Sequence, residues 1–264
     1  MGNDKLLINE SDLTKEHQGF FLIQSETLSR KFTSRRINFY SCINREAAQE
    51  QLVNLICDFK KKDSVTKIGF ADSVTLHQLN VFEIVDNIPD IEVINPFKRF
   101  PDGKYEAFGK QPPGRLNLPQ EEYYALVENV LQQMRDSLMT DIFITGTNAI
   151  TMNGQIVSID GTGNRVAGMI FGPKKVIILV GRNKVVREVD EAIKRIRNVA
   201  APLNFIRHNN KHHNRFDTPC LKLGYCTDCN HPRRACLNTV IIDGATEVNK
   251  DRLHLILVND ILGL

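Results

Sequence analysis

The sequence predicts an α/β fold: a mostly parallel central sheet with helices on both faces, preceded by a helical N-terminal extension. Short apolar runs of the kind found in buried strands alternate with longer segments of helical periodicity along most of the chain. Parallel strands need a crossover between neighbours, and helices usually supply it. With 42% hydrophobic residues among 264, the chain can also bury the core that this fold requires.

The first part of the chain opens with two helical patterns. We expect a helical extension over residues 1–36, with its helix from about residue 12, and an α/β domain over residues 37–264. Asn44 has the side chain of a helix N-cap, and the apolar spacing after it predicts a helix over residues 45–61. The other elements predicted here are strands at 39–43, 65–70 and 91–94 and a helix from about residue 75.

Residues 97–118 break this pattern. The segment is rich in Pro and Gly, and loops of this length in a compact domain are usually lids, binding loops or disordered. Its aromatic residues Phe97, Phe100, Tyr105 and Phe108 argue against disorder. We therefore expect an ordered excursion that packs over a ligand cleft or onto a second subunit. A surface excursion packed on its own aromatic residues is the alternative.

The second part of the chain continues the alternation. Pro119 opens a predicted helix that runs to about Met139. The Asn153-Gly154 pair lies between two alternating apolar runs and predicts a two-residue β-hairpin. The remaining predicted elements are strands at 141–145, 175–181, 239–243 and 252–258, a basic amphipathic helix at 185–199, and a solvated basic loop at 208–213.

Three loops rich in glycine and hydroxyl residues follow predicted strands, at 69–75, 146–148 and 160–165. Ligands of open α/β sheets bind beyond the carboxyl ends of the strands, where backbone N–H groups and helix N-termini suit an anion. The candidate ligand contacts are Ser73, Thr75, Asn148, Gly161, Thr162, Gly163 and Asn164, with Arg165 and Lys184 as countercharges. Asp72 and Asp160 are the candidates for a catalytic base. Ordinary turn chemistry is the alternative for each loop taken singly.

Four of the six cysteines, Cys220, Cys226, Cys229 and Cys236, lie in one turn-rich segment at 218–237. Thiolates this close, with a central C-x-x-C, can converge on one zinc ion or iron–sulfur cluster. Zinc ribbons usually have two separated C-x-x-C pairs whereas cluster spacings vary more, so an iron–sulfur cluster is slightly favoured. Disulfides are the third interpretation. They need an oxidising compartment, and the first residues do not resemble a signal peptide.

Several motifs match those of a known family. They are TGTNAIT at 145–151, DGTGNRVA at 160–167, FGPKKV at 171–176 and VGRNK at 180–184, followed by TPC at 218–220, CTDC at 226–229 and RAC at 234–236. They resemble the lactate-utilisation (LUD) domain, and the last three are similar to the cysteine tail of its short, stand-alone members. The resemblance implies a fold like that of the NagB/RpiA/CoA-transferase superfamily and a link to bacterial lactate or organic-acid oxidation.

Two features differ from the family pattern. Ala71-Asp72-Ser73 stands where the family usually has Gly-Gly-Ser, which places a carboxylate near the expected anion site. The twin ferredoxin motifs of the larger lactate-utilisation subunit are absent from this sequence. Because of the second difference, the resemblance does not by itself assign a redox role to this chain.

The leading hypothesis is a lactate-utilisation-like protein of organic-acid metabolism that binds a small carboxylate or phosphorylated ligand and holds a metal ion or iron–sulfur cluster. The alternative is a non-catalytic metal- or cluster-binding subunit or a regulatory sensor. A CoA transferase is less favoured, because no Glu stands beside a glycine loop at a strand end.

Composition and charge limit the partners. The net charge of +3 is too small for a dedicated nucleic-acid binder, and no apolar run is long enough to span a membrane. We expect a cytoplasmic protein that works with redox or lactate-oxidation proteins and forms a homo-oligomer.

Overall fold

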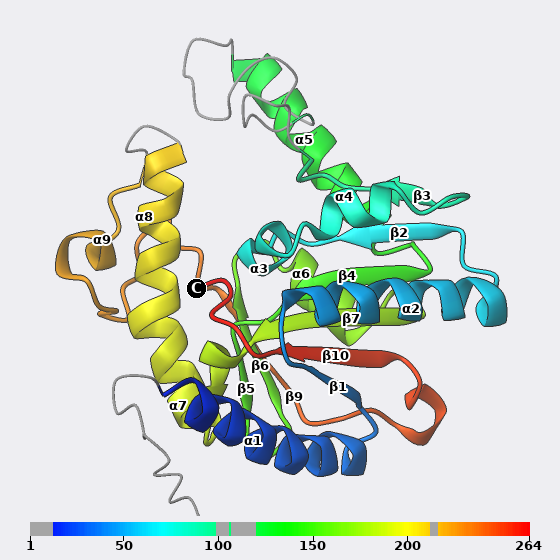
Figure 1. Ribbon diagram of the computed structural model, residues 1–264. Helices are drawn as coiled ribbons and strands as arrows, with labels where there is room; N and C mark the ends of the chain where they lie inside the picture. The colour runs from blue at the N-terminus through cyan, green and yellow to red at the C-terminus, as the bar shows by residue number, and fades with distance from the viewer. Residues whose placement is uncertain (1–12, 99–105, 107–119, 212–215) are drawn as a thin grey trace, which may run out of the picture.

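Two sheets organise the chain in the computed structural model, which describes residues 13–98, 106, 120–211 and 216–264 (Figure 1). The larger sheet has six strands in the order β1-β10-β7-β4-β2-β3, and all of its pairs are parallel. Its strands are β1 (Asn38–Cys42), β2 (Lys67–Phe70), β3 (Glu92–Ile94), β4 (Ile142–Gly146), β7 (Lys175–Gly181) and β10 (Leu253–Val258). The predicted α/β class with a parallel central sheet is confirmed.

The smaller sheet contains the predicted hairpin. Its four strands, in the order β8-β5-β6-β9, are β8 (Val185–Val186), β5 (Ala149–Thr151), β6 (Ile156–Asp160) and β9 (Asn238–Ile242). β5 and β6 pair antiparallel around the Asn153-Gly154 turn. Gly154 has φ +83°, a conformation that glycine adopts without the steric cost that a side chain would bring. The two strands of the hairpin belong to this smaller sheet and do not add strands to the larger one.

Helices cover both faces of the larger sheet. They are α1 (Thr14–Ser34), α2 (Arg45–Asp63), α3 (Val74–Gln78), α4 (Val81–Asp86), α5 (Gln120–Ser137), α6 (Asn164–Ile170), α7 (Val189–Arg195), α8 (Ala201–Lys211) and α9 (Pro219–Leu223). On one face, Leu52 of α2 and Leu76 of α3 pack with strand residues such as Ile144. On the other, a core cluster joins α1, α6 and the smaller sheet.

The helix expected as an N-terminal extension packs directly on the sheet. Phe21, Leu28 and Phe32 of α1 are almost fully buried. They belong to the same core cluster as Val176 of β7 and Leu255 of β10. α1 thus contributes to the core of the domain.

One predicted helix had the wrong limits. Residues 185–186 form β8, and the helix begins only at Val189, continues through a wide turn at Ile196–Ala200 and ends at Lys211. Pro202 has no N–H and its ring would clash with the carbonyl four residues earlier, so the helix widens there instead of stopping. The N–H of Ala201 accordingly bonds to the carbonyl oxygen of Ile196, five residues back.

This longer helix corrects a second prediction. The basic loop expected at residues 208–213 is helical as far as Lys211.

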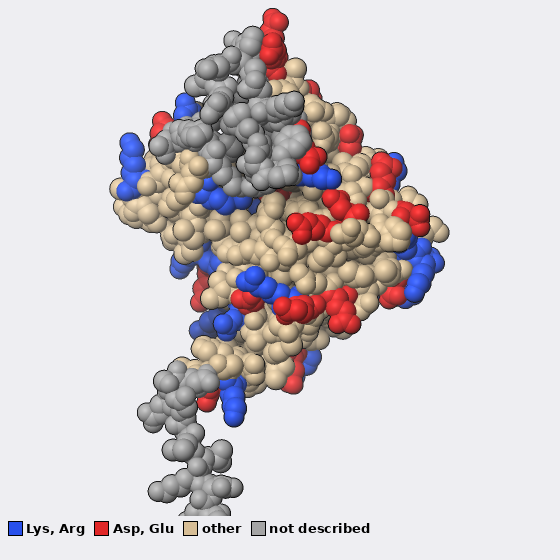
Figure 2. All heavy atoms as spheres, turned by 45° about the horizontal axis from the view of Figure 1, so that its top comes forward, with Lys and Arg blue, Asp and Glu red and all other residues tan. Residues whose placement is uncertain are grey.

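Most of the 97–118 excursion lies outside the described residues, except Phe97, which is 9% exposed, together with Lys98 and Glu106. In the part of the chain that is described, no helix is both long and apolar enough to cross a membrane. On the face seen in Figure 2, basic and acidic side chains are interspersed.

Candidate functional site

A cleft of about 440 Å³ lies between the carboxyl ends of the strands and helix α8. The loops after β2, β4 and β6 form one side of it, and α8 forms the other (Figure 1). Phe97, Phe205 and Phe216 contribute apolar surface to its lining. The fold therefore brings the three glycine-containing loops to one cleft, as strand-end loops of an α/β sheet are expected to meet.

Most of the residues selected from the sequence line this cleft. They are Asp72, Ser73, Asn148, Asp160, Gly161, Thr162, Asn164, Arg165 and Lys184. Thr75 is fully buried behind the lining, where its hydroxyl contacts Lys184. Gly163 is the N-cap residue of α6 with φ +92°, so its role is to turn the chain into the helix.

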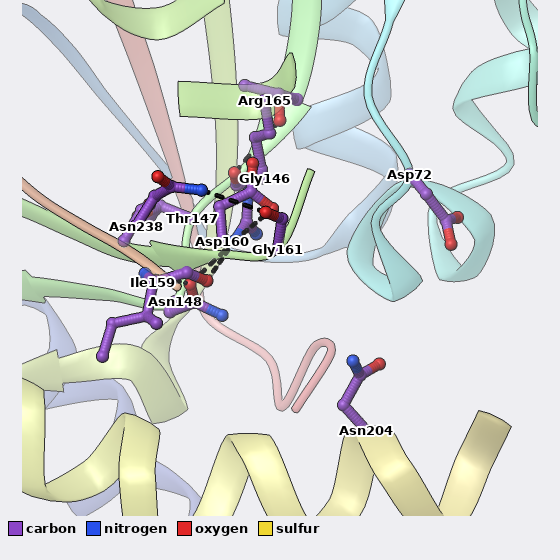
Figure 3. A network of polar contacts seen from close by, with 12 residues as sticks. Asp72, Gly146, Thr147, Asn148, Ile159, Asp160, Gly161, Arg165, Asn204 and Asn238 are labelled. Atoms are coloured by element: carbon purple, nitrogen blue, oxygen red, sulfur yellow. Dashed lines mark hydrogen bonds and ion pairs between the residues drawn. The ribbon is translucent and has the colours of Figure 1, made fainter. Parts of the chain in front are cut away.

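Arg165 and Asn148 form the centre of a polar network at the end of β6 (Figure 3). The Oδ1 atom of Asn148 accepts hydrogen bonds from Arg165 Nη2 at 2.9 Å and from the N–H of Ile159 at 3.0 Å. Arg165 Nη2 also donates to the carbonyl oxygen of Ile159 at 2.8 Å and lies 3.8 Å from Asp160 Oδ1. These contacts fix the guanidinium group at the cleft wall.

Two buried polar atoms of this network have no hydrogen-bond partner among the described residues. They are Arg165 Nε, a donor, and Asp160 Oδ2, an acceptor. Buried polar atoms in native proteins almost always find a partner, which can be water or a ligand. Both residues line the cleft, but these two atoms themselves are covered by protein.

Lys184 lies at the floor of the cleft and is only 4% exposed. Its Nζ donates to Thr75 Oγ1 and to the carbonyl oxygen of Thr147, each at 3.1 Å. Burial first, and then the nearby charges of Arg195 and Arg165, lower its pKa to about 7. A Cβ added at Gly263 would come within 2.5 Å of Nζ, so glycine is needed where the chain passes the amine.

Asp72, one of the two base candidates, is engaged in an ion pair with Arg207 and a hydrogen bond with His77. Its Oδ2 lies 3.3 Å from Arg207 Nη2, and its Oδ1 lies 3.1 Å from His77 Nε2. The first contact joins the loop after β2 to α8. In Figure 3, Asp72 and Asn204 of α8 lie apart from the Arg165 network. The geometry favours a role for Asp72 in holding the two walls of the cleft together.

Three residues of α7 and α8 that lie in the cleft or beside it were not selected as site candidates from the sequence. Asn204 and Arg207 line the cleft. Arg195 donates from Nη1 to the main-chain oxygens of Asn148 and Leu264, at 2.9 and 3.2 Å. The predicted helix ended before α8, so two of these residues fell outside any predicted element. The apolar residues that recur through 196–205 were the signal that the helix continues.

The four clustered cysteines line a single small cavity of about 10 Å³ next to the cleft. Cys220 lies in α9, and Cys236 also lines the larger cleft. The pKa of the Cys236 thiol is raised, mainly by burial and further by the other three cysteines. All four thiols are free. As arranged, no three of the described His, Cys, Asp or Glu side chains form a group that could hold a metal ion.

Comparison with known proteins identifies the family. The family model of the LUD domain matches residues 25–258. This chain belongs to the LUD domain family. The LUD match spans both sheets and the loops after β2, β4 and β6 that line the cleft.

A solved structure gives a more distant likeness to this LUD domain. It is described as the crystal structure of a DUF162 family protein from Deinococcus radiodurans. It shares 13% sequence identity, covers 92% of this chain and 98% of its own, and has a TM-score of 0.39. A similarity at that level is too weak to assign a function. No curated protein matches the chain.

Proposed function

We propose that this LUD domain protein serves organic-acid metabolism by binding a small carboxylate or phosphorylated ligand in the strand-end cleft. The observation that supports this most is the cationic Arg165 at the cleft wall, held there by hydrogen bonds to Asn148 and Ile159, with the amine of Lys184 at the floor of the cleft. Guanidinium and amine groups are the usual protein partners of carboxylate and phosphate.

The size and surface of the cleft suit such a ligand. Its volume of about 440 Å³ falls in the range of small-molecule sites, which is roughly 300–1,000 Å³. Ser73, Thr162 and Asn164 add polar side chains to the lining, and Gly161 leaves the backbone accessible. Of the two acidic residues in the lining, Asp72 is paired with Arg207 and Asp160 lies 3.8 Å from Arg165 Nη2. The basic side chains of Arg165, Lys184 and Arg207 outnumber these two acids, and this balance favours an anion.

Calorimetric titration of the full-length protein with lactate, pyruvate and inorganic phosphate tests this proposal. We expect saturable binding of at least one anion, and a loss of about tenfold or more in affinity in Arg165→Met, because a buried charge-assisted hydrogen bond contributes about 1.5–3 kcal/mol. Arg30→Met, on the exposed part of α1, is the matched control and should bind as wild type does.

Arg165→Lys keeps the positive charge at this position. Comparing its affinity and its melting with those of Arg165→Met distinguishes loss of the ligand contact from loss of structure. We expect it to bind more tightly than Arg165→Met, with both variants melting as single transitions. Absence of binding to every anion, or equal affinity in wild type and a folded Arg165→Met, would overturn the proposal.

A second candidate function is that of a metal- or cluster-binding protein. It is favoured by the four thiols around one small cavity, because four soft donors are the usual set for zinc or an iron–sulfur cluster. We propose that Cys220, Cys226, Cys229 and Cys236 bind such a group after a small rearrangement of their segment. The donors fit chemically, although their present arrangement is not that of a coordinated ion.

Metal analysis and the visible spectrum of protein purified without oxygen test this candidate. Stoichiometric iron with broad visible absorbance would indicate a cluster, and colourless protein with stoichiometric zinc would indicate a zinc site. The Cys226→Ser/Cys229→Ser variant should lose the metal, whereas Cys57→Ser in α2 should keep it. Metal-free protein that also fails to take up zinc or to be reconstituted with iron and sulfide would exclude both sites.

A further inference from the structure

Lys184 combines three properties that surface lysines lack. It lines the cleft, it is almost completely buried, and no ion pair joins it to a carboxylate in the described part of the chain. A lysine that serves only stability is usually exposed or paired with an acid when it is buried. The position of Lys184 therefore calls for a chemical explanation.

The hydrogen bonds around Nζ match a neutral amine. Two oxygen atoms lie within reach, Thr75 Oγ1 and the carbonyl oxygen of Thr147, both at 3.1 Å. A neutral amine has two N–H groups and one lone pair, whereas an ammonium group has three N–H donors. With two oxygen atoms for two N–H groups, the neutral form is satisfied and its lone pair is left for a reaction.

The charges that face Lys184 also favour the neutral form. Arg195 of α7 and Arg165 of α6 are the charged groups that act on it, and both are cationic. Together with burial, they lower the pKa of Lys184 to about 7, so much of the amine is unprotonated near neutral pH. A desolvated lysine beside another cation is a recognised form of activated amine nucleophile.

We propose that Lys184 Nζ forms an imine with the carbonyl carbon of a small 2-oxo carboxylate bound in the cleft. This inference rests on the proposed anion-binding function and deepens it by naming the substrate class. The carboxylate end would face the cationic wall at Arg165, and the adjacent carbonyl would face the amine. A 2-oxo acid is the small anion that satisfies both groups, because it carries a charge for the guanidinium and an electrophilic carbon for the amine.

The proposed reaction balances without an oxidant or a reductant. The lone pair of Nζ attacks the carbonyl carbon, the C=O electron pair moves to oxygen, and a proton moves from nitrogen to that oxygen to give a carbinolamine. Loss of one water molecule then gives the C=N bond. The Thr75 hydroxyl, 3.1 Å from Nζ, is placed to pass the proton. Thr75 was selected from the sequence as a ligand contact, and the structure places it as the neighbour of the amine.

Reductive trapping tests the inference on the wild-type protein. The probe is pyruvate with sodium cyanoborohydride, which converts an imine into a stable secondary amine, and peptide mass spectrometry locates the modified residue. We expect the adduct on the peptide that contains Lys184, saturating as pyruvate is raised. Lactate, which has a hydroxyl in place of the carbonyl, should give no adduct.

Two variants serve as matched controls. Lys184→Arg cannot form an imine, so trapping at this site should disappear. Lys62→Arg removes an exposed lysine, whose side chain is 74% exposed, and should leave trapping at Lys184 unchanged. Because the adduct is located in wild-type protein, the test does not depend on the folding of either variant.

The outcomes separate this inference from the proposed function. An adduct confined to Lys184 supports it. Pyruvate binding by calorimetry without an adduct, or adducts spread over exposed lysines such as Lys62 and missing from Lys184, overturns the imine and leaves anion binding in place. Absence of both an adduct and anion binding overturns the imine together with the proposed function.

Discussion

His254 is buried in β10 with both ring nitrogens in contact with polar partners. Nε2 lies 3.0 Å from the carbonyl oxygen of Asp251, and the hydroxyl of Tyr40 lies 3.2 Å from Nδ1. The ring of Phe59 packs against it edge-on at 4.8 Å between centroids. Burial is the main reason that its pKa is lowered to about 4. The folded protein therefore holds this imidazole neutral.

This burial predicts a pH dependence of stability. Between the ordinary pKa of about 6.5 and the folded value of about 4, the unfolded chain binds more protons at this site than the folded one. The stabilising effect of the neutral ring is therefore complete above about pH 6.5 and is lost as the pH falls toward 4. Urea unfolding from pH 7 to 4 should show a loss on the order of 3 kcal/mol from this residue.

His254→Gln should show a shallower fall in unfolding free energy over the same range, even if it is less stable at pH 7. His17→Gln, at an exposed position of α1, should keep the wild-type slope. Equal slopes in all three proteins would show that His254 does not titrate as a buried neutral ring.

Asn44 caps α2 through its side chain. Its Oδ1 accepts a hydrogen bond from the N–H of Ala47 at 2.9 Å, which satisfies one of the free donors at the helix start. We expect Asn44→Ala to lower the free energy of unfolding by about 1 kcal/mol. Asn54→Ala, at an exposed position inside the same helix, should be neutral or raise stability by a few tenths of a kcal/mol, because alanine is the better helix former.

The sequence revealed Asn44 and the strand-end residues but not the environment of Lys184. A helix cap depends on neighbours within four residues, so its pattern is local. The burial of Lys184 depends on Thr75, Thr147 and Gly263, which come from three distant parts of the chain. From the sequence alone, Lys184 was predicted as a countercharge, and its contacts with backbone and hydroxyl oxygens could not be seen.

At the scale of elements, α6 is packed so closely on β4 that one of its residues has no room for a side chain. A Cβ at Gly168 would lie 2.4 Å from the ring of Phe143, which is fully buried. We expect Gly168→Ala to destabilise the protein by about 1–3 kcal/mol, because the ring has no free space to move into. Thermal or urea unfolding measures the change.

Gly19→Ala is the matched control for that variant. Gly19 is inside α1, and an added Cβ there would have no neighbour within 4 Å. Replacing a helical glycine with alanine should raise stability by up to about 1 kcal/mol. If Gly168→Ala also raised stability, the close packing of α6 on β4 would be disproved.

Element types were predictable from periodicity, but the end of one helix was not. The buried strands and the 45–63 helix have strong local patterns, and the structure contains them. The predicted helix ended at residue 199, whereas the helix that begins at Val189 continues to Lys211. The wide turn at Ile196–Ala200 accommodates Pro202, and that solution depends on local geometry that a hydrophobic pattern does not encode.

At the scale of the whole molecule, the cleft depends on the meeting of distant parts of the chain. The loops after β2, β4 and β6 belong to two different sheets, and α8 closes the cleft from the side. Parallel topology made the meeting of the β2 and β4 loops predictable, because these strands are parallel neighbours in one sheet and their carboxyl ends lie on one edge. The contribution of α8 was not predictable, because its ion pair between Arg207 and Asp72 joins residues far apart in sequence.

The arrangement of the four cysteines was also only partly predictable from the sequence. Their closeness in sequence predicted that they would gather, and all four line one cavity. The identity of a bound group depends on how far their sulfur atoms converge, which spacing alone does not determine. Cys236 lines both this cavity and the cleft. The proposed metal site and the proposed anion site are therefore neighbours.

The central claim is that the strand-end cleft binds a small anion beside Arg165 and Lys184. A crystal structure of the full-length protein grown with pyruvate tests it most directly. We expect density for the anion inside the cleft, with its carboxylate within hydrogen-bond distance of Arg165 and its carbonyl carbon next to Lys184 Nζ. Density for pyruvate outside this cleft, or a cleft without the anion at a saturating concentration, would show that the cleft is not the anion site.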